Sequence, residues 1–197
     1  MKYPTRAQAE ALLLWAVGRN PGPWEAHSRC AARAAEAIAA AAGIDRDLAW
    51  CAGLLHDVGR YEGVTGLRHA VAGRELLAEK GYPDLGRICL THSFPSPDLG
   101  QYIGHRDAGE AGEAMIREAL LQVDELDRLI QLCDAICMAE GVVLMEVRLV
   151  DVALRHGLPG GVVGKWRAFF DIKRDFERRI GRSIYALFPE VASLSVR

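Results

Sequence analysis

The sequence lacks the marks of several protein classes. No apolar run approaches the ~20 residues of a membrane-spanning helix. The five cysteines are scattered among mostly apolar neighbours without a CxxC pair, which predicts reduced cysteines in a core. The formal net charge of -2 is nearly neutral and argues against a broad nucleic-acid-binding surface. We therefore expect neither a membrane nor a nucleic acid as partner.

The first residues resemble a secretory signal peptide only faintly. Lys2 and Arg6 precede the apolar run "ALLLWAV". That run is short, Glu10 lies directly before it, and no small-residue cleavage site follows. We expect a cytoplasmic protein.

Length and periodicity predict one all-α domain over residues 1–197. With 50% hydrophobic residues, the chain can build one sizeable core, and no two-residue alternation indicates a strand. The predicted fold is a compact helical bundle with one long irregular stretch at 93–106, typical of a functional lid or a disordered segment. Helices are expected from a capping box at Thr5 and Gln8, from Pro23 to Gly43, from Asp45 to Gly59, and over about 68–80, 83–92, 106–121, 124–140, 146–156 and 161–180. Residues 160–182 are locally basic, for which a solvated helix face is the favoured interpretation over a partner surface.

The segment "WCAGLLHDVGR" places His56 and Asp57 side by side in an apolar helix. Neighbouring helical residues point about 100° apart, so both side chains can converge on one small site without stacking on each other. A buried carboxylate is costly unless it is paired, and no Lys or Arg lies one turn earlier, although Arg60 follows. A metal ion would satisfy both side chains.

Two further polar residues lie on apolar helix faces. His27 shares its face with Trp24, Cys30 and two alanines, and Asp134 shares its face with Ile130, Cys137 and Met138. Such a mixed nitrogen and oxygen set suits Mn, Fe, Co, Ni or Zn, whereas Mg would require more oxygen. The candidate ligands are His27, His56, Asp57 and Asp134.

This order of ligands resembles the HD-domain superfamily of metal-dependent phosphohydrolases. The element "LLHDVGR" is similar to the family's "LLHDIGK", and the resemblance covers roughly residues 20–140. It implies an HD metal-binding core there, with 141–197 as a C-terminal helical extension packed on it. The four candidate ligands match the family's four ligand positions.

The two-metal branch of the family suggests two more ligands. His69 in "LRHAVAGRELL" and His92 in "RICLTHSF" match its second site, and Asp57 would then bridge two metals. Alternatively, His69 is a helix cap or a surface residue, and His92 interacts with the negative, C-terminal end of a helix dipole. The pattern resembles the HDIG-like, small single-domain bacterial hydrolases of dinucleoside polyphosphates. Cyclic-dinucleotide hydrolases usually carry a double His and a GYP element, which this chain lacks, so that substrate is disfavoured.

The resemblance predicts a hydrolase of phosphoesters or phosphoanhydrides. One or two divalent metals would lower the pKa of a bound water and hold phosphoryl oxygens. The expected substrate is a small phosphorylated molecule, with a nucleotide or dinucleotide as the favoured class. The candidate catalytic residues are Asp57, Arg60 and Arg68. The two arginines would hold phosphate, or alternatively their side chains are solvated. The long loop offers four candidate substrate-binding residues: Phe94, Tyr102, His105 and Arg106. Alternatively, the loop is a disordered connection whose aromatic residues only pack on the core.

Two other functions remain open at this point. The same scaffold can hold two irons and activate oxygen, which would make the protein a di-iron oxygenase. A non-catalytic regulatory module that binds a ligand is the second alternative. The sequence leaves a homodimer open.

Overall fold

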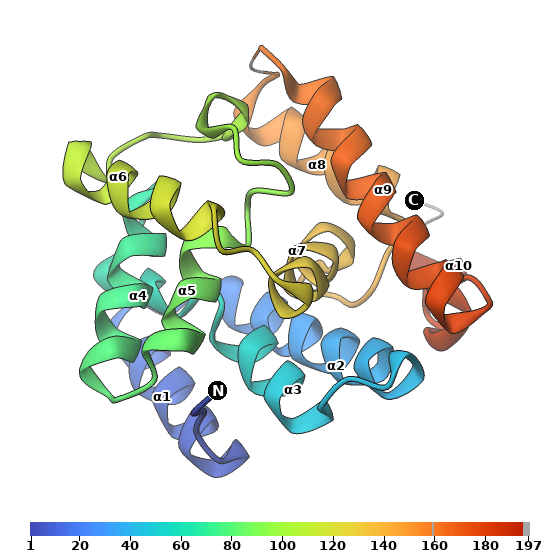
Figure 1. The fold of residues 1–197 in the computed structure, drawn as a ribbon, viewed down its shortest axis with the longest axis horizontal. Helices are drawn as coiled ribbons and strands as arrows, with labels where there is room; N and C mark the ends of the chain where they lie inside the picture. The colour runs from blue at the N-terminus through green and yellow to red at the C-terminus, as the bar shows by residue number, and fades with distance from the viewer. Residues whose placement is uncertain (159, 195–197) are drawn as a thin grey trace.

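Local capping signals set the ends of the first three helices in the computed structural model, which describes residues 1–158 and 160–194 (Figure 1). Helix α1 (Arg6–Arg19) begins at the predicted capping box, in which the side chains of Thr5 and Gln8 each accept from the other's backbone N–H. Helix α2 (Trp24–Ala42) ends at Gly43, whose φ of 71° suits glycine. Helix α3 (Arg46–Leu55) begins where the Asp45 carboxylate accepts two backbone N–H bonds.

The other secondary-structure elements of the described residues are also helices. No β-strand occurs among residues 1–158 and 160–194, which confirms the all-α prediction. In that same part of the chain, no helix combines the length and apolarity needed to cross a bilayer. The further elements are the 3-10 helix η1 (Val58–Glu62), α4 (Arg68–Glu79), α5 (Pro83–Thr91), the 3-10 helix η2 (Leu99–Gln101), α6 (Gly109–Leu120), α7 (Glu125–Ile136), α8 (Met145–His156), α9 (Val162–Ile180), the 3-10 helix η3 (Ile184–Leu187) and α10 (Val191–Leu194).

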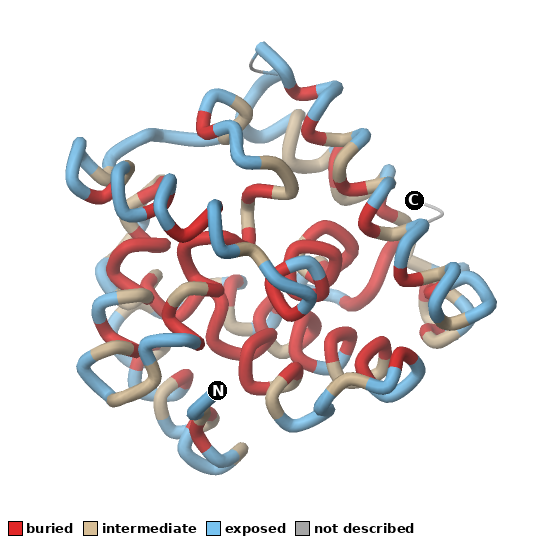
Figure 2. Tube along the Cα trace, in the orientation of Figure 1, coloured by how far each residue is buried: buried red, intermediate tan, exposed pale blue. Residues whose placement is uncertain are grey.

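Helix α7 occupies the middle of the fold. It contacts α2, α3 and α5 on one side and α8 and α9 on the other. Buried segments concentrate where these helices meet, while the outer faces of α1, α6 and α9 are exposed (Figure 2). A second, smaller apolar cluster includes Leu67, Val71, Leu90, Phe94 and Ile116 and lies partly beneath the 93–106 loop.

Three helices are shorter than their hydrophobic pattern predicts. Helix α3 ends at Leu55, and the chain tightens into η1 before it reaches the predicted end at Gly59. Helix α6 begins at Gly109, since the Asp107 carboxylate instead accepts hydrogen bonds from two backbone N–H groups at the start of α4. Helix α7 ends at Ile136, where Cys137 becomes extended and forms a β-bridge with Val142.

Gly59 allows η1 to pack directly on the backbone of α4. A Cβ atom added there would lie 1.9 Å from the His69 carbonyl oxygen and 2.3 Å from the Gly73 nitrogen. No side chain fits this approach, so a larger residue must push η1 away from α4. This contact fixes the position of Asp57, which lies directly before η1.

We predict that Gly59→Ala lowers the free energy of unfolding by at least ~2 kcal/mol, because the added methyl overlaps backbone atoms. Chemical denaturation measures the change. Gly18→Ala in α1 is the matched control, since its Cβ would meet no atom within 4 Å. The control should stay within about 1 kcal/mol of the wild type. Equal stability of all three proteins would contradict the proposed contact.

Candidate metal centre

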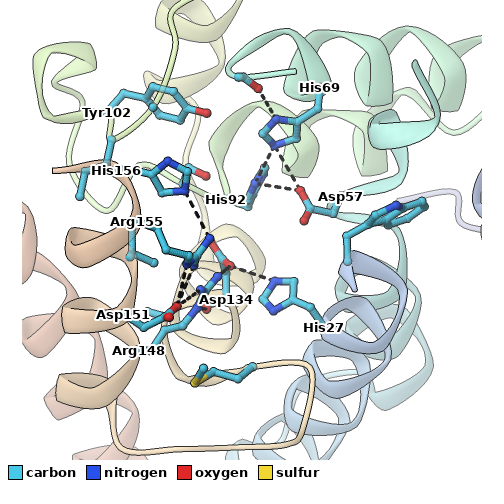
Figure 3. A pocket seen from close by; sticks show the side chains of 18 of the residues that line it. His27, Asp57, His69, His92, Tyr102, Asp134, Arg148, Asp151, Arg155 and His156 are labelled. Carbon is cyan, nitrogen blue, oxygen red and sulfur yellow. Dashed lines mark hydrogen bonds and ion pairs between the residues drawn. The ribbon is translucent and has the colours of Figure 1, made fainter. Parts of the chain in front are cut away.

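The candidate ligands come from helix ends and helix faces that meet beside α7. His27 lies on α2, and His69 lies in the first turn of α4. His56 and His92 each follow the last residue of a helix, α3 and α5 respectively. Figure 3 shows Asp57, His69 and His92 turned toward one another, with His27 and Asp134 close by. The structure thus brings together all six ligands predicted from the sequence.

Backbone carbonyl groups hold the four imidazole rings in one tautomer. In each ring Nδ1 lies within hydrogen-bond distance of a carbonyl oxygen, which can only accept, so Nδ1 carries the proton and Nε2 keeps a lone pair. The four Nδ1 to oxygen distances are 3.2 Å from His27 to Cys137, 2.7 Å from His56 to Gly53, 2.5 Å from His69 to Gly66 and 2.8 Å from His92 to Cys89.

The Nε2 atoms left by this arrangement face each other in pairs. The distance between them is 3.2 Å for His27 and His56, and 3.4 Å for His69 and His92. Lone pairs at these distances repel unless a proton or a cation lies between them. Burial lowers the pKa of His27, and it lowers the pKa of His92 to about 3, so neutral rings are favoured near pH 7. A cation therefore fits this space better than extra protons.

Asp57 has a buried oxygen atom without a hydrogen-bond donor. Its Oδ2 accepts from Arg60 Nε at 2.7 Å, whereas none of the described residues donates to Oδ1. Burial opposes ionisation of Asp57, but the positive charge of Arg60 holds its pKa well below the usual range. The Oδ1 atom lies 3.2 Å from His69 Nε2 and 3.6 Å from His92 Nε2. An ionised carboxylate with such an unsatisfied atom fits a bound cation.

Two groups of potential ligands share Asp57. In each group the ligand atoms lie within 4.8 Å of one another. The first contains His27, His56 and Asp57, and the second contains Asp57, His69 and His92. These groups could hold one or two divalent metal ions, and their mixed nitrogen and oxygen atoms are ligands that transition metals accept.

Asp134 borders the first group and is held by a residue that the sequence analysis missed. Its Oδ1 lies 3.1 Å from His27 Nε2 and 3.6 Å from an Nη atom of Arg148 on α8. Burial opposes ionisation, but the positive charge of Arg148 helps to keep the pKa of Asp134 below its usual range. Arg148 also lies 3.3 Å from Asp151, which therefore supports Asp134 indirectly.

A cavity of about 760 Å³ opens over the metal ligands. Arg60, Tyr102 and His105, which the sequence analysis proposed, line this cavity. Figure 3 shows Tyr102, Arg155 and His156 across the cavity from Asp57. Other lining residues come from the C-terminal helices and were not predicted: Arg148, Asp151, Arg155, His156, Lys165, Trp166 and Phe169. The basic segment 160–182, for which a solvated helix face was favoured, thus supplies a part of this wall.

Three proposed substrate contacts lie elsewhere. The Arg68 guanidinium pairs with Glu62 and Glu75, and the Arg106 guanidinium pairs with Glu113. Phe94 is 2% exposed and stacks on Tyr102, with ring centroids 5.6 Å apart. None of the three lines the described cavity, so their geometry gives no support to a direct phosphate or substrate contact.

Comparison with known proteins identifies the family of the chain. The model of the HD domain matches residues 24–139, so the chain belongs to the HD-domain family. This is the family whose metal-dependent phosphohydrolases the sequence resembles. No curated protein matches the chain. Among solved structures, the chain is similar to the HD domain of the phosphodiesterase PgpH from L. monocytogenes, with 18% identity and a TM-score of 0.45 over 86% of this chain and 95% of that one.

The shared position of Asp57 predicts the metal content of variants. We expect two divalent ions per wild-type protein, about one in the His69→Ala, His92→Ala double variant, and a large loss from both positions in Asp57→Ala. Elemental analysis after anaerobic purification measures these ratios. His156→Ala is the control, because His156 lines the cavity outside both ligand groups and should leave the ratio at two. Equal metal content in wild type and the double variant would contradict a second site at His69 and His92.

Proposed function

We propose that the protein is a metal-dependent hydrolase of a phosphoester or phosphoanhydride, with Asp57 shared between two metal positions. The observation that carries the proposal is the unsatisfied Oδ1 of Asp57 facing histidine Nε2 atoms on a cavity floor. Membership of the HD-domain family supports the same chemistry. Bound divalent ions would supply a water of lowered pKa and would offset charge on phosphoryl oxygens.

The protein's own groups would fix the ligands and orient the substrate. Arg60 holds Asp57 through Nε, and in the described part of the chain its two Nη groups have no hydrogen-bond partner. Because Arg60 lines the cavity, these groups are available to phosphoryl oxygens, for which a guanidinium is well shaped. Arg60 would thus connect the carboxylate to the substrate.

A nucleotide is the substrate that we favour. The cavity of about 760 Å³ is large enough for one, and its walls include the aromatic residues Trp24, Tyr102, Trp166 and Phe169. Flat rings beside a phosphate-binding floor suit the stacking of a base. We further propose that residues 141–197 form an extension of the HD core that completes this cavity, since α8 and α9 supply much of its wall. The cytoplasmic location and the homodimer stay predictions.

Loss of the shared carboxylate should abolish hydrolysis. We predict that Asp57→Asn shows no measurable turnover of phosphomonoesters, phosphodiesters or dinucleoside polyphosphates that the wild type cleaves, because its amide is a poor metal ligand. Asp175→Asn, which changes an exposed carboxylate on α9, should keep wild-type activity. Circular dichroism checks that both variants fold. Wild-type turnover by a folded, metal-free Asp57→Asn protein would rule out the proposed function.

The role of the aromatic wall can be separated from the metal centre. Tyr102→Ala should raise KM for a nucleotide several-fold and spare a small generic phosphoester, since only the nucleoside part loses a contact. Tyr102→Phe keeps the ring and should behave like the wild type. Phe94→Ala, at a buried position, should instead lower thermal stability. Equal changes in KM for both substrates in Tyr102→Ala would contradict the nucleotide assignment.

A further inference from the structure

Lys165 is a buried cation that faces the cavity without an anionic partner. It lies in the first turn of α9, is 7% exposed and lines the cavity wall. Within residues 1–158 and 160–194, no hydrogen bond or ion pair involves its ammonium group. A charged group so removed from water is costly unless a counter-charge is supplied. An anion beside Lys165 would offset this cost.

The other cations of the cavity already have carboxylate partners. Arg60 pairs with Asp57 at 2.7 Å, and Arg155 pairs with Asp151 at 2.7 Å. Arg148 lies between two carboxylates, as described above. Lys165 therefore differs from its neighbours in having its positive charge uncompensated.

Aromatic rings surround the Lys165 ammonium but compensate it weakly. The Nζ atom lies 6.0 Å from the ring centroid of Phe94 and 5.9 Å from those of Tyr102 and Phe169. These distances are at the outer limit of a cation–π interaction, so each ring offsets the charge only weakly. Burial lowers the pKa of Lys165 to about 8, so the group still carries a proton near pH 7. The rings thus leave the charge of Lys165 available to an anion.

The Lys165 position is separate from the metal ligands. Asp134 is the carboxylate whose charge acts on Lys165, yet no ion pair within 4.0 Å joins them in the described structure. No candidate ligand of either metal group hydrogen-bonds to Lys165. An anion held by Lys165 would therefore be a different group from one held at Asp57.

We propose that Lys165 binds a second anionic group of the substrate, apart from the phosphoryl group that is cleaved beside Asp57. This inference rests on the proposed function and narrows the substrate class. The substrate would carry two separated anionic groups, as a nucleoside bisphosphate or a compound with phosphate groups at both ends does. A simple monoester with one phosphate would leave Lys165 uncompensated.

Non-hydrolysable phosphonates test the inference by binding alone. Alkane diphosphonates with chains of one to six carbons are compared by calorimetry with alkyl monophosphonates of the same length, on the metal-loaded protein. At least one diphosphonate should bind the wild type ten-fold or more tighter than its monophosphonate. Lys165→Met should lose this advantage, Lys165→Arg should retain most of it, and the monophosphonate should bind all three proteins alike. No advantage in the wild type, or the same advantage in Lys165→Met, would overturn the inference.

Thermal stability gives a second readout without any ligand. Since Lys165→Met removes an uncompensated charge and keeps an apolar stem, its Tm should equal or exceed that of the wild type. A lower Tm would show that the ammonium already has a structural partner and would contradict the inference. Failure of the proposed function would give a different result. The protein would then hydrolyse no phosphorylated substrate, although diphosphonates would still bind more tightly than monophosphonates in a manner that depends on Lys165.

Discussion

The packing of the helices gathers four imidazole lone pairs and two carboxylates in one buried space. Four imidazole rings, each fixed through Nδ1 by a carbonyl group, turn their Nε2 lone pairs toward each other and toward carboxylate oxygens. His27 Nε2 lies 3.1 Å from Asp134, and His69 Nε2 lies 3.2 Å from Asp57. No donor reaches Asp57 Oδ1 within the described structure. Positive charge in this space would turn the repulsion into attraction, so metal binding and stability are expected to be coupled.

Helix ends explain how a short sequence pattern produces this geometry. His56 and His92 each follow the final residue of a helix and reach the carbonyl oxygen three residues earlier. Carbonyl groups in the last turn lack intrahelical partners and are free to accept such bonds. His69 uses the carbonyl of Gly66 in the same spacing, just before α4. Ring orientation at these three positions is therefore a local property of the chain, whereas convergence depends on how the helices pack.

This distinction explains what the sequence could predict. Caps such as Thr5 and Asp45 and polar residues on apolar helix faces act locally, so the helices and four of the candidate ligands could be predicted from the pattern. His69 and His92 were proposed only from the family resemblance. The shortened α7 depends instead on a turn that pairs Cys137 with Val142. Arg148 and Lys165 carry no local signal for a site, because only packing of α8 and α9 on α7 brings them to the cavity. Likewise, no pattern showed that glutamates would pair with Arg68 and Arg106.

Anomalous X-ray diffraction from crystals grown with Mn²⁺ would show whether Asp57 is shared between two metal ions. We expect two anomalous peaks, one on either side of the Asp57 carboxylate. One should be bound by His27 and His56, and the other by His69 and His92. A single peak, or manganese at sites that do not include Asp57, would contradict the account.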